Sequence, residues 1–155
     1  MRLALFQPDI PQNLGAALRL GACLNVAVDV IEPCGFPLSN AAIRRTALDY
    51  GALADVTRHA GWTDFHAFAA RERRRIILFT TTAASPFQFF DHAPGDILLF
   101  GRESAGVPPA VHADVQARLF IPLAAGARSL NVVTAAALAL GQALRQIDGF
   151  PKPAP

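Results

Sequence analysis

Apolar and polar residues follow two patterns along the chain: short apolar runs, and longer stretches in which apolar residues recur every three or four positions. The short runs have the length and composition of strands buried in a parallel sheet. We predict strands over residues 3–6, 26–31, 55–57, 76–81, 97–100 and 118–121. The longer stretches predict helices that begin near residues 13, 39 and 62, and a last helix over 130–147. This alternation predicts an α/β fold, with a mainly parallel sheet and helices on both faces.

The stretch 130–147 is the longest helical pattern, and Asp148-Gly149 followed by Pro151 ends it. Ser129 and Asn131 stand at its start, where either can cap the helix. The free N–H groups and the positive end of the helix dipole at this point can equally meet a ligand oxygen. Asn13 is the predicted N-cap of the first helix. The apolar face of the last helix is predicted to hold Leu130, Val133, Ala137, Leu140, Leu144 and Ile147.

The length and composition indicate one compact domain, since 155 residues, 52% of them hydrophobic, can form an adequate core. We expect the domain to span residues 1–150, with a proline-rich tail over 151–155.

No apolar run is long enough to cross a bilayer, and the N-terminal one is too short for a signal peptide. Cys23 and Cys34 lack metal-type spacing, so we expect no metal site and two buried thiols in a reducing compartment, the cytoplasm.

The net charge of +2 does not by itself indicate a nucleic-acid partner. Thirteen of the fourteen basic residues are arginine, and Lys152 is the only lysine. The guanidinium group suits phosphates and stacking on bases, although a genome that prefers arginine codons gives the same bias. The run RERRR at 71–75 is interpreted as the solvated end of a helix.

Three loops are candidates for a ligand site, because ligands of parallel sheets bind beyond the carboxyl ends of the strands. They follow Phe79, Phe100 and Ile121. The loop 101–106 has two glycines and the carboxylate of Glu103, but neither the dinucleotide pattern nor the phosphate-loop pattern. A carboxylate and backbone amides suit a ligand that has an amine, a carboxylate and an adenine. The alternative for Glu103 is an ion pair with a nearby arginine.

Three separated motifs resemble the SPOUT class of RNA methyltransferases. They are Asn13-x-Gly15-x-x-x-Arg19, LLFGRESAGVP from Leu98 to Pro108, and IPLAAGARSLNV from Ile121 to Val132. They occur in the family's order, each at a junction between strand and loop. The small size and the segments IEPCGFPL, RRTALDY and VTRH are similar to the subgroup that methylates the ribose 2′-hydroxyl of the wobble nucleotide in tRNA. The resemblance covers Leu3 to about Gly149.

The resemblance implies a sheet whose C-terminal segment threads through a loop to form a trefoil knot, a rare exception to the usual connection rules. It also implies a homodimer, with the helix 130–147 as the expected interface because Ala137 and Gly141 permit close approach. The loops of the knot are expected to bind S-adenosylmethionine. The residues that match the family's cofactor site are Phe79, Thr80, Gly101, Gly106, Ile121, Ser129 and Leu130.

In the implied reaction the ribose 2′-oxygen attacks the sulfonium methyl group, with the two atoms held roughly 3–3.5 Å apart. Arg19 matches the family's motif arginine, and we expect it to orient a phosphate and stabilise the developing alkoxide. A guanidinium is effectively always protonated, so Arg19 is a poor proton acceptor, and the identity of the acceptor stays open. The other residues expected at the reaction centre are Asn13, Glu103, Ser129 and Asn131.

For RNA contact we expect Arg44, Arg45 and Arg58, each with a solvated surface role as the alternative. His59 is interpreted as a surface histidine, and Tyr50 and Trp62 as core or interface residues, either of which could also stack on a base. The expected partner is the tRNA anticodon stem-loop, held by the two basic surfaces of a dimer, with an affinity that falls as salt rises.

Two other functions stay open. The first is a related 2′-O-methyltransferase that acts on ribosomal RNA or on another tRNA position. The second is a non-catalytic RNA-binding or nucleotide-binding α/β module. Against the second stands the joint presence of Arg19, Glu103, Ser129 and Asn131.

Overall fold

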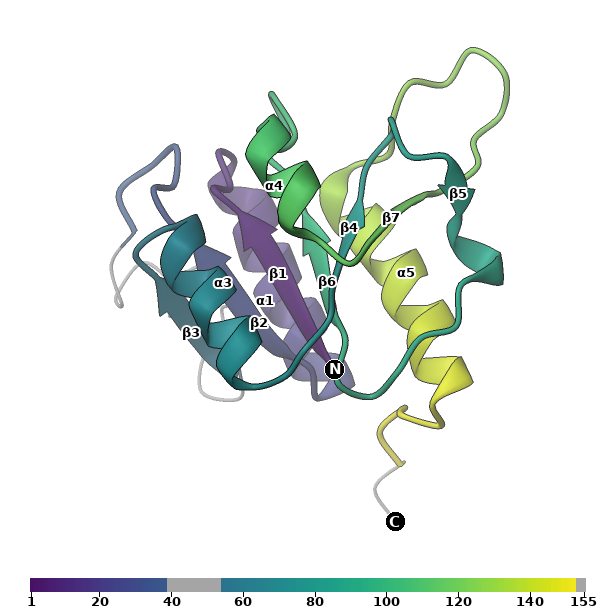
Figure 1. Cartoon of the computed structure of the whole chain (residues 1–155), viewed down its shortest axis with the longest axis horizontal. Coiled ribbons are helices and arrows are strands. Elements are labelled where there is room, and N and C mark those ends of the chain that lie inside the picture. The colour runs from purple at the N-terminus through teal and green to yellow at the C-terminus, as the bar shows by residue number, and fades with distance from the viewer. Residues whose placement is uncertain (39–53, 153–155) are drawn as a thin grey trace.

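The computed structural model describes residues 1–38 and 54–152. Within these residues, the centre is a seven-stranded sheet in which every strand pair runs parallel (Figure 1), as the sequence predicts. One strand was not predicted, because two residues at a sheet edge are too short to carry a periodic signal. In spatial order the strands are β3 (Val56–His59), β2 (Ala27–Ile31), β1 (Arg2–Phe6), β6 (Ile97–Phe100), β4 (Ile76–Phe79), β7 (Ala117–Phe120) and this edge strand, β5 (Ser85–Pro86).

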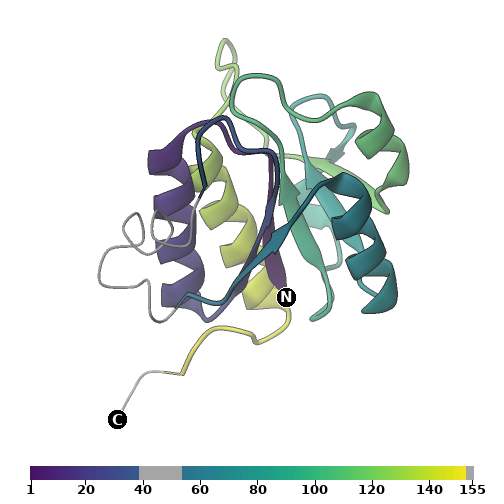
Figure 2. The same ribbon diagram turned by 90° about the vertical axis from the view of Figure 1, so that its left-hand side faces the viewer.

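Helices cover both faces of the sheet, which confirms the prediction (Figure 2). The helices α1 (Pro11–Leu24) and α5 (Val132–Gln146) pack on one face, and α3 (Trp62–Arg71) and α4 (Pro109–Asp114) pack on the other. A short 3-10 turn, η2 (Phe87–Phe89), follows β5. In the part of the chain that is described, no helix has the length and apolar character needed to cross a membrane. The helix predicted after Ser39, with Arg44, Arg45 and Tyr50, lies outside the described residues.

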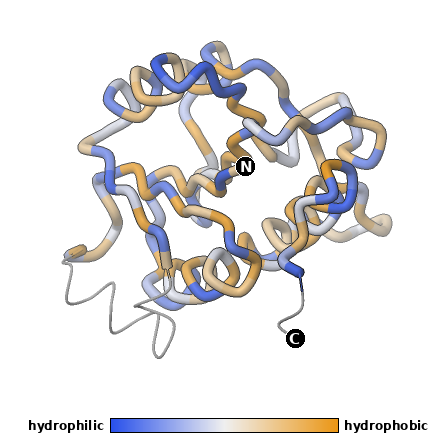
Figure 3. Tube along the Cα trace, turned by 90° about the horizontal axis from the view of Figure 1, so that it is seen from below, coloured by the Kyte–Doolittle hydropathy of each residue, from blue (hydrophilic) through white to orange (hydrophobic). Residues whose placement is uncertain are grey.

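Each apolar strand supplies two hydrophobic cores, because successive strand residues point to opposite faces of the sheet. Leu98 and Phe100 of β6 belong to the core under α1 and α5, whereas Ile97 and Leu99 belong to the core under α3 and α4. A strand buried on both faces needs no polar positions, so these runs are continuously apolar. The helices around the sheet differ, since hydrophilic and hydrophobic positions alternate along them (Figure 3).

The N-termini of the two helices that pack together, α1 and α5, are built differently. The N-cap position of α1 is Ile10, and no side chain caps the helix, so the prediction of Asn13 as its N-cap is wrong. Pro11 has no N–H group, which leaves the first turn with one fewer donor to satisfy. Asn131 does cap α5, because its Oδ1 accepts hydrogen bonds from two backbone amides of the first turn, at 2.9 and 3.3 Å.

The buried face of α5 is rotated from the predicted one. Ala137 is exposed, so its place in the predicted apolar face is wrong. Small side chains allow α5 to lie close to α1 and the sheet, so alanines make up much of the buried face of this helix. The residues buried on α5 are Ala136, Ala139, Leu140, Ala143 and Leu144.

A buried polar network ties β1, β2 and β3 together. Asp29 is fully buried and accepts hydrogen bonds from Arg2 at 2.6 and 2.9 Å, while His59 lies 2.8 Å from it. The prediction of His59 as a surface histidine is therefore wrong, since only 3% of the residue is exposed. The expectation of two buried thiols also fails, because Cys23 is exposed and Cys34 is half-buried. Residue type alone did not predict how exposed these three side chains are.

We predict that Asp29→Ala destabilises the protein by about 3–5 kcal/mol, because the partly buried Arg2 and the buried His59 would lose their shared acceptor. Chemical denaturation of the purified protein measures this difference. Asp91→Ala is the matched control, since Asp91 is exposed, and it should leave the free energy of unfolding within about 0.5 kcal/mol. Equal stability of the two variants would contradict a stabilising role for the network.

Candidate functional site

A cavity of about 590 Å³ opens at the carboxyl edge of the sheet, where the loops after β4, β6 and β7 meet. This volume lies within the range of roughly 300–1,000 Å³ that small-molecule sites occupy. The three loops named as candidates from the sequence all line it. The lining comprises Ile10, Asn13, Leu78–Thr81, Phe100–Val107, Ile121, Leu123, Arg128–Val132 and Ala135.

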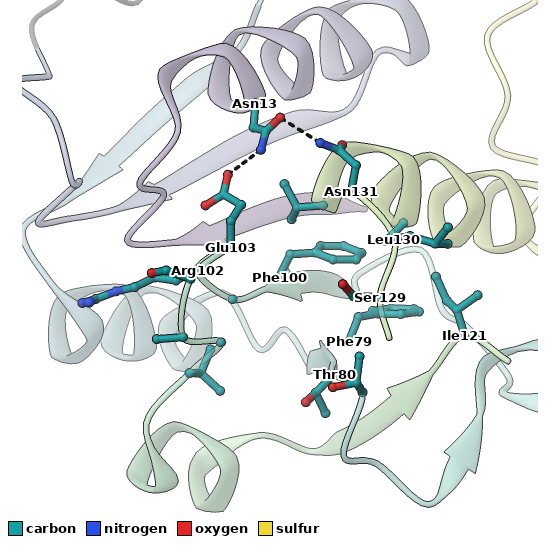
Figure 4. A pocket seen from close by; sticks show the side chains of 18 of the residues that line it. Asn13, Phe79, Thr80, Phe100, Arg102, Glu103, Ile121, Ser129, Leu130 and Asn131 are labelled. Carbon is teal, nitrogen blue, oxygen red and sulfur yellow. Dashed lines mark hydrogen bonds between the residues drawn. The ribbon is translucent and has the colours of Figure 1, made fainter. Parts of the chain in front are cut away.

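Two stacked aromatic rings line the cavity. Phe79 ends β4 and Phe100 ends β6, and the two residues are register partners on neighbouring strands. Their rings therefore stack, with centroids 5.0 Å apart and an angle of 13° between the planes. Ile121 and Leu130 stand beside them (Figure 4). This part of the cavity suits a flat, aromatic group such as a purine.

The loop 101–106 is closed by its own backbone. Arg102 and Gly106 exchange two N–H···O hydrogen bonds of 2.9 Å. A Cβ atom at Gly101 would lie 2.6–2.9 Å from backbone atoms of Gly106, whose φ of +65° itself favours glycine. The sequence suggested that both glycines let the backbone approach a ligand. The structure shows that Gly101 is needed for the loop to close on itself.

One amide side chain joins the three motifs at the polar end of the cavity. Asn13 donates to Glu103 Oε1 at 2.9 Å and accepts from Asn131 Nδ2 at 3.0 Å (Figure 4). Asn131 also caps α5, so this contact fixes the start of that helix against α1. In the described part of the chain Glu103 pairs with Asn13 and a backbone amide, and the alternative of an ion pair with arginine is not what the structure has.

A second layer of contacts, from the loop after β1, holds the loop 101–106 from outside. Gln7 accepts a hydrogen bond from Arg102, and the Asp9 amide donates to Glu103 Oε2 at 3.2 Å. The Asp9 carboxylate accepts from the amide of Ser104 at 3.3 Å and from its hydroxyl. Sequence reasoning missed Gln7 and Asp9, although their place at the carboxyl end of a predicted strand was a usable signal.

The pKa values of the two acidic groups in this layer, Asp9 and Glu103, are shifted in opposite directions. Contact with the carboxyl group of Glu103, followed by the hydrogen bonds from Ser104, lowers the pKa of Asp9 to about 2. Burial, followed by contact with Asp9, raises the pKa of Glu103 above its ordinary value. The two carboxyl groups therefore differ strongly in their affinity for a proton.

Of the other residues expected at the site, some line the cavity and others do not. Ser129 lines the cavity, and so does Arg128, which the sequence analysis did not select. Arg19 is exposed on α1 and does not line it. It follows Asn13 by six positions, about 9 Å along the helix axis. Arg58 is bound to Glu32 at 2.8 and 2.9 Å.

The cavity fits the cofactor that the sequence analysis expects, S-adenosylmethionine. The stacked rings of Phe79 and Phe100 suit the adenine. The amides, hydroxyl and carboxyl of the polar end supply donors and acceptors for the ribose and the amino-acid part. The residues expected from the resemblance to hold the cofactor all lie in the lining: Phe79, Thr80, Gly101, Gly106, Ile121, Ser129 and Leu130.

Comparison with known proteins gives consistent matches over nearly the whole chain. The model of the SpoU rRNA Methylase family matches residues 1–141. A tRNA (cytidine(34)-2′-O)-methyltransferase of Beijerinckia indica is 52% identical over 97% of this chain and 94% of its own. A structure described as "Structural insights into the 2-OH methylation of C/U34 on tRNA" is 36% identical and covers 96% of both chains, with a TM-score of 0.88. The SpoU methyltransferase AviRb from Streptomyces viridochromogenes, solved with AdoMet, shares the fold at 21% identity and a TM-score of 0.84, over 94% of this chain and 60% of its own.

We predict that Gly101→Ala weakens binding of S-adenosylhomocysteine at least tenfold, about 1.4 kcal/mol, because the added Cβ would force the loop 101–106 open. Isothermal titration calorimetry measures the affinity, and circular dichroism verifies the fold. Gly95→Ala is the control, since a Cβ there meets nothing within 4 Å. Unchanged affinity in Gly101→Ala would show that closure of this loop is not required for binding.

Proposed function

The chain belongs to the SpoU rRNA Methylase family, and we propose that it methylates the ribose 2′-hydroxyl of the wobble nucleotide, position 34, of tRNA. Its methyl donor is S-adenosylmethionine. The observation that carries the proposal is the contact of Asn13 with both Glu103 and Asn131, which joins the three motifs beside the aromatic part of the cavity. The names of the relatives supply the substrate.

The cofactor supplies a methyl group made electrophilic by a positively charged sulfur. Phe79, Phe100 and Leu130 would hold the flat end of the ligand away from water, beside the loop 101–106. Asn13 and Asn131 keep the polar end rigid, so that the ribose oxygen can be held in line at roughly 3–3.5 Å. Arg19 orients an adjacent phosphate and stabilises negative charge as it develops on the 2′-oxygen.

A trefoil knot is part of the proposal for the fold. The segment after β7 lines the cavity together with the loops after β4 and β6, and it then enters α5 on the face that α1 covers. A C-terminal segment threaded through the loop before it would keep the three loops together without a disulfide or a metal.

We propose a homodimer formed through the outer faces of α1 and α5. Arg19 is exposed on α1 and lies outside the cavity of its own chain, and a second copy that brings its own Arg19 to this cavity would complete the site. On α5 the exposed Ala137 and the half-buried Gly141 permit close approach, and Leu138 is 47% exposed. These two helices pack against each other.

The anticodon stem-loop is the part of tRNA that carries position 34, and we propose that it contacts the rim of the cavity. Arg128 lines that rim and supplies a positive charge. Arg44 and Arg45 stay proposals from the sequence, while Arg58 would contact RNA from its position beside Glu32. The cytoplasm is the compartment that we propose, and the free thiols of Cys23 and Cys34 fit it.

We predict that the purified protein transfers labelled methyl groups to unmodified tRNA, and that nuclease digestion with mass spectrometry places a 2′-O-methylated pyrimidine at position 34. The control is a tRNA that already carries a 2′-O-methyl group at this position. A product only on ribosomal RNA or at another tRNA position would replace the proposed substrate. Cofactor binding without a product on any RNA would favour the non-catalytic alternative.

We predict that Arg19→Ala and Asn13→Ala each lose methyl transfer, and that mixing the two restores it. In a randomly mixed population half of the dimers contain both variants, and each of these has one complete site, so roughly a quarter of the wild-type rate should return. Arg19→Ala should keep its affinity for S-adenosylhomocysteine because Arg19 does not line the cavity. Two dimeric, folded variants that do not complement each other would rule out a site shared between copies.

A further inference from the structure

The carboxyl groups of Asp9 and Glu103 adjoin each other behind the polar end of the cavity. Both oxygens of Glu103 accept hydrogen bonds, one from Asn13 and one from the Asp9 amide. Asp9 Oδ2 accepts from the amide and hydroxyl of Ser104. Asp9 Oδ1 is buried, and among the described residues no N–H or O–H group of another residue satisfies it. A buried carboxylate oxygen without a donor is costly, so this atom calls for an explanation.

Among the described residues, no positively charged group donates a hydrogen bond to the pair. Its donors are all neutral: the Asn13 amide, two backbone N–H groups and the Ser104 hydroxyl. In the described part of the chain neither carboxyl group forms an ion pair. Arg102, from the same loop as Glu103, is bound to Gln7. Two adjoining carboxylates without a cation cannot both ionise cheaply.

The loop behind Asp9 prevents it from moving away. Gly35 donates its N–H to the Pro8 carbonyl at 3.0 Å, and a Cβ atom at Gly35 would lie 2.7 Å from the Cβ of Asp9. The titratable neighbour on this side is Cys34, whose pKa is raised to about 11, first by burial, so that it stays a neutral thiol. On the other sides stand Asn13 of α1 and, beyond it, Asn131 of α5, which do not titrate.

We propose that Asp9 and Glu103 hold a single proton between them, so that Glu103 acts as a neutral hydrogen-bond donor to Asp9 and Asp9 acts as a positioning residue for methyl transfer. The proton satisfies Asp9 Oδ1 and leaves one negative charge on the pair. Glu103 is then not the group that accepts the proton of the ribose hydroxyl. This inference rests on the proposed function for its role in methyl transfer, but the shared proton can be tested without turnover.

With the proton on Glu103, the side chains of the site form a series in which each one donates a hydrogen bond to the next. Asn131 donates to Asn13, Asn13 donates to Glu103, and Glu103 donates to Asp9. The pKa values agree, since that of Asp9 is lowered to about 2 and that of Glu103 is raised. The stabilising contribution of Glu103 is therefore present at low pH and is lost as the pH rises through its raised pKa. That of Asp9 is lost only as the pH falls towards about 2.

The first test measures the proton directly, by the ¹³C chemical shifts of the two carboxyl groups during a pH titration of the whole protein. We expect Glu103 to stay protonated to a pH above the ordinary range of a glutamate, while Asp9 stays ionised to well below the ordinary range of an aspartate. In Asp9→Asn the pKa of Glu103 should fall. A wild-type Glu103 that ionises within the ordinary range of a glutamate would overturn the proposal, whether or not the protein methylates tRNA.

The second test compares amide and alanine variants in methyl transfer to tRNA. Glutamine in Glu103→Gln keeps an N–H donor for the Asp9 carboxylate and an acceptor for Asn13, and loses only the acceptor for the Asp9 amide. Its kcat should therefore exceed that of Glu103→Ala roughly tenfold. We expect the methyl-transfer rate of the wild type to fall at high pH, when the pair loses its proton. This fall should be absent in Glu103→Gln. The kcat of Asp9→Asn should likewise exceed that of Asp9→Ala. Equal losses in Glu103→Gln and Glu103→Ala would show that the charged carboxylate is required, and would overturn the proposal.

Discussion

The two hydrogen bonds of Asn13 are the interaction on which the candidate site depends. One end of its amide holds Glu103, in the loop after β6, and the other holds Asn131, the N-cap of α5. Because an amide both donates and accepts, it can join these groups only in one orientation. The cavity loop and the start of the last helix are thereby fixed relative to α1. A glutamate or an alanine at this position could not make both contacts.

The parallel sheet provides the frame in which these contacts can form. All strands end at the same edge, so residues far apart in the sequence, such as Phe79 and Phe100, become neighbours in register. Their stacked rings make the apolar part of the cavity, while the loops that leave the same edge supply its polar part. The division between an aromatic part and an amide-rich part follows from where each strand ends.

The polar layer behind the cavity holds the loop 101–106 partly through two carboxyl groups that, among the described residues, have no cation as a partner. Asp9 and Glu103 come from different loops and lie against neutral donors, with Gly35 close behind. A lysine or arginine in this place would provide charge balance, but it would also bring a mobile side chain close to the cofactor loop. A shared proton removes one of the two negative charges in the space of a single hydrogen bond.

The sequence by itself determined the elements and the motifs. Continuous apolar runs predicted the buried parallel strands, and the loops after Phe79, Phe100 and Ile121 are the ones that meet at the cavity. Only the tertiary structure decided how side chains within those elements are used. Asn13 looked like a helix cap but joins two other loops, Ala137 turned to the surface, and His59 is buried against Asp29. Gln7 and Asp9 carried no motif, and Arg19 lies outside the cavity of its own chain. Periodicity reports which residues are apolar within one element, whereas these positions depend on which other element lies opposite, and local sequence does not encode that.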